Sequence, residues 1–143
     1  MSARKIKIKQ ENKSNSFKYL KKAEDNYNQM LTALNNNNYN AAGTLAIQCG
    51  ISAADAVCVH EKRVRSLSQN HLDLCDLVKS ISLPEAKDKS NVLKRIISKK
   101  NLIQYESRSI YKNEANEIVK GATRFYQWVV FSSKINNPSD RQD

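Results

Sequence analysis

Apolar residues recur every three or four positions through most of this chain, which is the spacing of one face of an α-helix. The longest such segment runs from 40 to 65, and it carries a second stripe of small residues, Ala42, Ala46, Gly50 and Ala54. A helix that is apolar around most of its circumference is typical of the centre of a bundle. We therefore predict that 40–65 forms a central helix against which the rest of the chain packs.

The same periodicity predicts further helices before and after this segment. Their expected N-terminal capping residues are polar side chains that accept a hydrogen bond from the first turn: Ser16, Asn70, Ser90 and Asn113. The asparagine tract 35–38 should end the first helix, and Pro84 the third. Helices joined by short connections pack as antiparallel neighbours. The expected fold class is therefore all-α, an up-and-down antiparallel bundle of four main helices with a fifth, shorter one.

The two ends of the chain are polar and lack this periodicity. Residues 1–15 are rich in lysine, and Ile6 and Ile8 alternate with charged residues in a way that could support a short strand. A lone strand is not stable, so we predict a disordered basic arm over 1–15. The helical bundle should then occupy 16–135, and 136–143 should form a flexible tail.

Composition limits the classes of protein to consider. A chain of 143 residues is long enough for one domain with a real core. Its three cysteines form no Cys-x-x-Cys pair, and its two histidines show no metal-ligand spacing, so we expect buried thiols, no metal site and no cofactor. The sequence shows neither a signal peptide nor an apolar run of about 20 residues. We therefore expect a cytoplasmic protein that is not associated with a membrane.

Lysine and arginine outnumber aspartate and glutamate, 24 to 14, which gives a formal net charge of +10. Such an excess attracts RNA or another polyanion, including an acidic protein; it could also serve solubility alone. The basic residues gather on one expected helix face, at Lys94, Arg95, Lys99 and Lys100. A row of this kind suits contacts to phosphates, although a simply solvated face would have the same composition.

One pair of residues has the chemistry of a metal-independent nuclease. Arg65 and His71 are separated by five residues at a predicted helix boundary. Arginine can hold a phosphate through two donors, and histidine titrates near neutrality and can move a proton. Together they could promote attack of an RNA 2′-hydroxyl on the adjacent phosphate. The structural alternative is that Arg65 only complements the C-terminal end of one helix dipole and His71 begins the next helix.

The central segment also contains one carboxylate, Asp55. A buried charge is costly unless it is paired, so Asp55 should either face solvent or have a cationic or hydrogen-bonding partner. Lys100, Tyr105 and Arg108 are the candidates from one later segment, and we expect a polar site between helices formed by Asp55 and Tyr105. A purely structural anchor that fixes helix register is the alternative.

The chain resembles the HEPN superfamily of small helical-bundle proteins over roughly 17–130. The likeness rests on the order of the helices and on four segments, AIQCGISAADAV, His71-Leu-Asp-Leu, Lys100-x4-Tyr105-Glu106 and Asn113-Glu114-Ala115 with Ala122-x2-Phe125. The resemblance implies a bundle that forms a homodimer, and a place among the bacterial toxin–antitoxin and defence proteins, with a protein antitoxin as partner. Many such relatives are metal-independent ribonucleases whose Arg and His stand at the spacing of Arg65 and His71.

Two functions follow as hypotheses. The first is an RNA-binding, HEPN-like endoribonuclease in which Arg65 holds the scissile phosphate and His71 acts as acid or base. The alternative is a non-catalytic interaction module that binds nucleic acid or an acidic protein through Lys94, Arg95, Lys99 and Lys100. A small-ligand site at Asp55 is a third hypothesis, which a dry core around that residue would remove.

Overall fold

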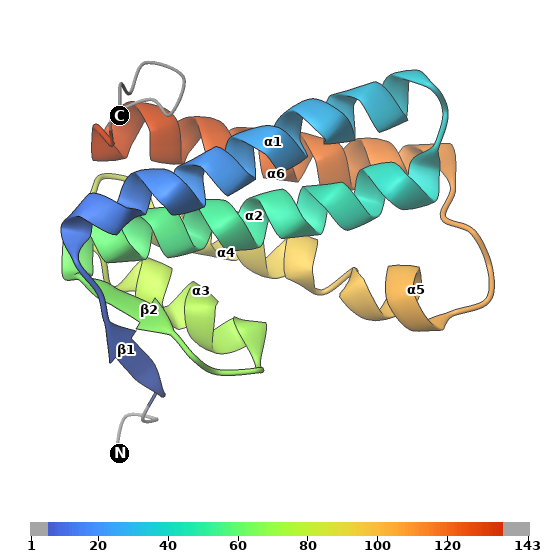
Figure 1. Ribbon diagram of the computed structural model, residues 1–143. Helices are drawn as coiled ribbons and strands as arrows, with labels where there is room; N and C mark the ends of the chain where they lie inside the picture. The colour runs from blue at the N-terminus through green and yellow to red at the C-terminus, as the bar shows by residue number, and fades with distance from the viewer. Residues whose placement is uncertain (1–5, 136–143) are drawn as a thin grey trace.

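The structure, a computed structural model, describes residues 6–135 and is mainly α-helical, as predicted. Its regular elements are, in chain order, β1 (Ile8–Gln10), the short 3-10 helix η1 (Lys13–Asn15), α1 (Ser16–Asn35), α2 (Tyr39–Lys62), β2 (Val64–Ser66), α3 (His71–Lys79), α4 (Ala86–Ile97), α5 (Lys100–Tyr105) and α6 (Lys112–Ser133). Figure 1 shows the long helices α1, α2 and α6 lying side by side, with α4 behind α2 and with α3 and α5 below it.

Helix α2 is the centre of the molecule, which confirms the central role predicted for 40–65; the helix ends earlier than predicted, at Lys62, and Val64–Ser66 form β2. It packs against α1 and α6 along most of its length and also contacts α3, α4 and α5. Every residue from Ala53 to Val59 is buried, so the helix is enclosed on all sides there. Small side chains make this possible: at Gly50, an added Cβ would lie 3.1 Å from a methyl group of Leu93 in α4.

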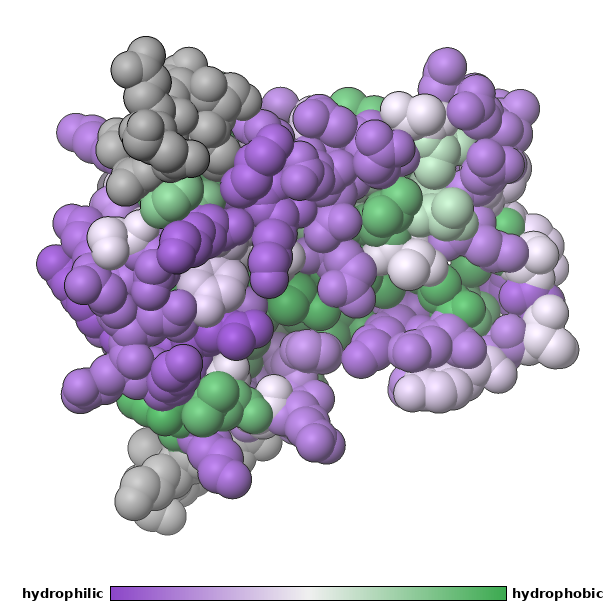
Figure 2. All heavy atoms as spheres, viewed as in Figure 1, coloured by the Kyte–Doolittle hydropathy of each residue, from purple (hydrophilic) through white to green (hydrophobic). Residues whose placement is uncertain are grey.

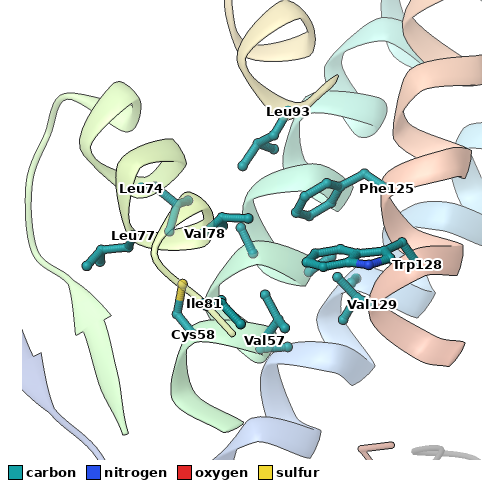
Figure 3. Packing of buried hydrophobic residues seen from close by; sticks show 14 of the residues in the cluster. Val57, Cys58, Leu74, Leu77, Val78, Ile81, Leu93, Phe125, Trp128 and Val129 are labelled. Carbon is teal, nitrogen blue, oxygen red and sulfur yellow. The ribbon is translucent and has the colours of Figure 1, made fainter. Parts of the chain in front are cut away.

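Large side chains of α6 complete the core. Figure 3 shows Phe125 and Trp128 of α6 in one cluster with Val57 of α2 and Val78 of α3. Trp128 is only 5% exposed, and its indole Nε1 donates a hydrogen bond to the Pro84 carbonyl oxygen at 2.9 Å. Sequence patterning predicts Trp128 at the edge of the apolar face; the structure instead buries it, because the connection before α4 covers that side of α6.

The predicted disordered arm is wrong over residues 6–15. Strand β1 pairs with β2 in antiparallel register, with Lys9 opposite Arg65. The pairing extends at both ends, through hydrogen bonds from Leu67 N to the Lys7 carbonyl and from Glu11 N to the Arg63 carbonyl. The prediction failed because the partner strand is hidden in the short link between α2 and α3. Residues 1–5 and the predicted tail 136–143 lie outside the described residues.

The helix boundaries confirm one predicted cap and correct three. Helix α1 begins at Ser16 itself, with Asn15 as its cap, and α6 begins at Lys112, with Tyr111 as its cap, so Asn113 lies inside that helix. Asn70 caps α3 as predicted, since its side chain accepts a hydrogen bond from Leu72 N. Helix α4, however, begins at Ala86 and not after Ser90. Glu85 takes the left-handed conformation (φ 68°), which turns the chain directly after Pro84, and Ser90 lies buried within the helix.

One helix of the described part, α2, is long and apolar enough to cross a bilayer by length and composition. The prediction that no segment of the chain could span a bilayer is therefore wrong by these two criteria. Within the structure, 72% of that window is buried against other elements of the protein, as in the core helix of a globular domain. Figure 2 shows the face in view as mostly hydrophilic, with hydrophobic surface in a band over α2 and in a smaller patch over the two-stranded sheet.

Candidate functional site

Arg65 lies beside Asp55 because the chain reverses sharply after α2. The reversal occurs at Arg63, which ends α2 in the left-handed conformation (φ 55°). Strand β2 then runs beside β1, and the Arg65 Nε atom comes within 3.5 Å of an Asp55 carboxylate oxygen. This separation is an ion pair and too long for a good hydrogen bond; the buried Nε has no hydrogen-bond partner among the described residues.

A tyrosine of α1 holds the other side of the Arg65 guanidinium. The Arg65 Cζ atom lies 5.1 Å from the centre of the Tyr19 ring, in the range of a cation–π contact. The Tyr19 hydroxyl donates to the Glu11 carboxylate, with oxygen separations of 2.7 and 2.8 Å. Burial and this hydrogen bond raise the pKa of Tyr19 to about 12, so the hydroxyl stays protonated. Arg65 is therefore fixed between Asp55 and Tyr19.

His71 lines a cleft that this pair also lines. It is the first residue of α3, and the Asn70 cap sets where that helix begins. The cleft has a volume of about 240 Å³, and its walls come from α2, β2, the following loop and α3; they comprise Ile51, Asp55, Arg65, Ser66, Leu67, Ser68, His71 and Leu74. We call it the Arg–His cleft. The two residues singled out by their spacing thus line one depression, together with Asp55.

Asp55 is the member of this group whose charge is costly to bury. Its side chain is 9% exposed, and burial raises its pKa to about 6, against the opposing effect of Arg65. The carboxyl is therefore mostly ionised at pH 7 and becomes protonated in mildly acidic solution. Arg65 is the cation that lets Asp55 keep its charge inside the protein.

The His71 ring is available for chemistry. Burial, and secondarily the positive charge of Lys100, lower its pKa below the ordinary value of 6.5. The ring is therefore neutral at pH 7, with an unprotonated nitrogen that could accept a proton. Within residues 6–135, the ring makes no hydrogen bond or ion pair that would occupy that nitrogen.

A second depression adjoins the Arg–His cleft on the side of α1. It has a volume of about 390 Å³ and is lined by residues of α1, α2 and β2, among them Tyr19, Lys22 and Gln48. Ile51, Asp55 and Arg65 line both depressions. The Arg65–Asp55 pair is therefore accessible from two depressions. Because Asp55 borders these depressions and is not enclosed in a dry core, a small-ligand site at Asp55 stays a hypothesis.

The structure does not bring Asp55 and Tyr105 together, so the predicted site between them is wrong. Tyr105 ends α5 and is 73% exposed. Helix α5 packs near the beginning of α2, where Ile103 contacts Gly43, three helical turns before Asp55. Arg108 is likewise occupied elsewhere, in a two-point ion pair with Glu114. The partner of Asp55 is Arg65, which sequence spacing did not indicate.

The predicted basic face of α4 divides into separate surfaces. Lys94 is close enough to Cys75 of α3 to influence its pKa, and Lys100 does the same at His71. Arg95 and Lys99 instead line a groove between α4 and α6. Helix α6 adds two basic residues to that groove, Lys120 and Arg124, which residue pattern did not predict. The same pattern did not predict Tyr19 and Glu11 beside Arg65 either.

All three cysteines are buried free thiols, as predicted. Burial raises the pKa of Cys49 to about 12 and that of Cys75 to about 11, so neither is a ready nucleophile. Among residues 6–135, no group of three or more His, Cys, Asp or Glu side chains is arranged to hold a metal ion.

No protein-family model matches this chain, and no curated protein matches it either.

Proposed function

We propose that the protein binds RNA and cleaves it in the Arg–His cleft without a metal ion. The observation that carries the proposal is that Arg65 and His71 line one cleft, with Arg65 held by Asp55 and Tyr19 and the His71 ring unoccupied. A fixed cation beside a neutral imidazole suits charge stabilisation and proton transfer at a phosphodiester.

In the proposed reaction, Arg65 binds the scissile phosphate. Its Nε edge faces Asp55, which leaves the terminal amino groups as donors to two phosphate oxygens. His71 takes the proton of the ribose 2′-hydroxyl, and the 2′-oxygen attacks phosphorus. The bond to the 5′-oxygen breaks, and that oxygen takes a proton from water. The products are a 2′,3′-cyclic phosphate and a 5′-hydroxyl.

Asp55 acts in this scheme as a positioning residue. Its carboxylate holds the guanidinium toward the cleft, and Tyr19 limits the rotation of the same group from the other side. A side chain held by its surroundings loses less conformational entropy when it binds a ligand. The site is therefore ready for a phosphate before RNA arrives.

The oligomeric state, the cellular role and the protein partner also belong to this proposal. The resemblance to the HEPN superfamily supports an up-and-down bundle of four main helices, a homodimer, a toxin or defence role in the cytoplasm, and an antitoxin protein as partner. The second candidate function is a non-catalytic module that binds nucleic acid or an acidic protein. It is supported by the exposed cations Lys94 and Arg95 of α4 and Lys99 in the turn after it.

The test compares wild type with Arg65→Ala, His71→Ala and His60→Gln on mixed RNA in EDTA. His60→Gln is the matched control, because it removes the other histidine, which lies outside the cleft. The proposal expects cleavage by wild type and His60→Gln, and none by the other two variants. Equal cleavage by wild type and His71→Ala would show a contaminating nuclease and remove the assignment.

A further inference from the structure

A second basic depression lies between α4 and α6, away from the Arg–His cleft. It has a volume of about 360 Å³, and we call it the α4–α6 groove. Its lining comprises Val92, Arg95, Ile96, Ser98, Lys99, Glu117, Ile118, Lys120, Gly121 and Arg124. Not one of these residues lines the Arg–His cleft. Four cations and one carboxylate leave the groove with an excess of positive charge.

The close approach of the two helices forms the floor of this groove. At Gly121, an added Cβ would lie 3.1 Å from Ile96 Cγ1 and 3.8 Å from Val92 Cγ1. The floor is therefore apolar and narrow, with the charged side chains along its two rims. On each rim the cations are four residues apart: Arg95 on α4 and Lys99 in the turn that follows it, and Lys120 and Arg124 on α6, where four residues are about one helical turn.

Few carboxylates lie near these cations: Glu117 lines the same groove, and Glu114 is close enough to Lys99 for that lysine to lower its pKa. Among residues 6–135, no carboxylate lies within ion-pair distance of Arg95, Lys120 or Arg124. Like charges gathered around a partly enclosed groove repel each other and attract anions. An anionic ligand would relieve that repulsion.

An exposed aromatic side chain continues the basic face of α6. Lys120, Arg124 and Phe131 follow one another at helical spacing, four and then seven residues apart. Phe131 is 77% exposed, although its neighbours Val129 and Trp128 are buried. An exposed phenylalanine at the end of a basic row is a combination typical of surfaces that bind single-stranded nucleic acid.

We infer that the α4–α6 groove and Phe131 bind a single strand of RNA. Phosphates lie between the two rims and contact Arg95, Lys120 and Arg124, while one base stacks on the Phe131 ring. An acidic protein would also satisfy the cations, but the exposed aromatic ring favours RNA because every base presents a π-face. The inference goes beyond the proposed function, since this surface would bind RNA whether or not the Arg–His cleft cleaves it.

Fluorescence anisotropy with a labelled 12-nucleotide 2′-O-methyl oligouridine tests this directly. The probe has no free 2′-hydroxyl, so binding is measured separately from cleavage. We expect Arg95→Gln/Lys120→Gln/Arg124→Gln to weaken binding about tenfold or more and to reduce the slope of log affinity against log salt by about two. Phe131→Ala should weaken binding about tenfold without changing that slope.

The matched control removes the same charge elsewhere, through Lys13→Gln/Lys18→Gln/Lys79→Gln, all exposed and outside the groove. The control, and the charge-retaining Arg95→Lys/Lys120→Arg/Arg124→Lys, should bind within about twofold of wild type. Equal weakening by the test and control triples would overturn the inference, because binding would then follow net charge alone. Tighter binding of poly(glutamate) than of the oligonucleotide would overturn it in favour of an acidic protein. Loss of RNA cleavage in Arg65 or His71 variants has no bearing on either outcome.

Discussion

Arg65 Nε lies 3.5 Å from the Asp55 carboxylate, and this one ion pair joins the buried centre of α2 to the strand that follows it. Asp55 is nearly enclosed, whereas 40% of the Arg65 side chain is exposed. The pair therefore connects the core to a surface cleft that also contains His71. This connection makes the cleft sensitive to changes in the core and to pH.

The pH dependence of stability should reveal the cost of burying Asp55. The folded carboxyl, with a pKa of about 6, binds its proton more tightly than the unfolded one at 3.8. Its stabilising contribution is therefore fully present below pH 3.8 and is lost as pH rises through about 6. We expect wild type to lose up to about 3 kcal/mol of unfolding free energy relative to Asp55→Asn between pH 4 and pH 7.5. Urea unfolding of both proteins across that range measures it, and a difference independent of pH would contradict the burial argument.

Replacement of Arg65 by lysine should separate charge from geometry. Lysine keeps the positive charge but has neither the planar fork that binds two phosphate oxygens nor the flat face that contacts Tyr19. We expect Arg65→Lys to cleave RNA about 10²-fold more slowly than wild type, with a smaller loss of stability than Arg65→Ala. Arg65→Ala leaves the Asp55 charge unpaired, at a cost of roughly 1–3 kcal/mol. Cleavage by Arg65→Lys at the wild-type rate would mean that a point charge is sufficient.

The charge of Lys100 should set part of the proton affinity of His71. Burial lowers the pKa of His71 first, and the Lys100 ammonium lowers it further because it repels the imidazolium. Lys100→Gln removes that repulsion, so the pKa of His71 should rise toward 6.5, and the acidic limb of the pH–cleavage profile should move to higher pH. NMR titration of the His71 ring protons, assigned with His71→Ala, measures the shift. A matched Lys79→Gln variant should leave the titration where it is.

Strand β1 should be needed to hold Arg65 in place. Lys9 lies opposite Arg65, and the hydrogen bonds at Lys7–Leu67 and Arg63–Glu11 place this pair among the hydrogen-bonded pairs of the ladder. Lys9→Pro removes the donor N–H and should release β2. We expect cleavage to fall at least tenfold while the helical circular dichroism stays within about a tenth of wild type. Lys9→Ala keeps the backbone bond and should cleave normally; an equal loss in both variants would assign the effect to the lysine side chain.

Local pattern was sufficient for the helical core, and it singled out Arg65 and His71, which line one cleft in the structure. The three- and four-residue spacing around Ala53 and Val57 reports burial on every side of α2, and the Asn70 cap is a local signal at the start of α3. Residue type alone marks an arginine and a histidine as a pair that can bind a phosphate and move a proton. These features depend on residues close together in the chain.

Contacts between distant segments were beyond that kind of prediction. The pairing of Asp55 with Arg65 depends on the left-handed turn at Arg63 and on a strand partner near the N-terminus. Tyr105 was assigned to Asp55 on residue type, because helical periodicity does not say where along α2 a later helix packs. Lys120 and Arg124 lie on α6, where the sequence pattern indicates the apolar face and does not show which helix the polar face adjoins. The close approach of α4 and α6 at Gly121 places them in one groove with Arg95.

The central claim is that His71 directs an RNA 2′-hydroxyl at a phosphate held by Arg65. Its most direct test incubates the protein in EDTA with three end-labelled oligonucleotides of one sequence, made of RNA, of 2′-O-methyl RNA and of DNA. We expect that RNA alone is cut, that the products end in 2′,3′-cyclic phosphate and 5′-hydroxyl, and that His71→Ala cuts none of the three. Cleavage of the DNA or the 2′-O-methyl strand, or 3′-hydroxyl ends on the RNA products, would contradict it.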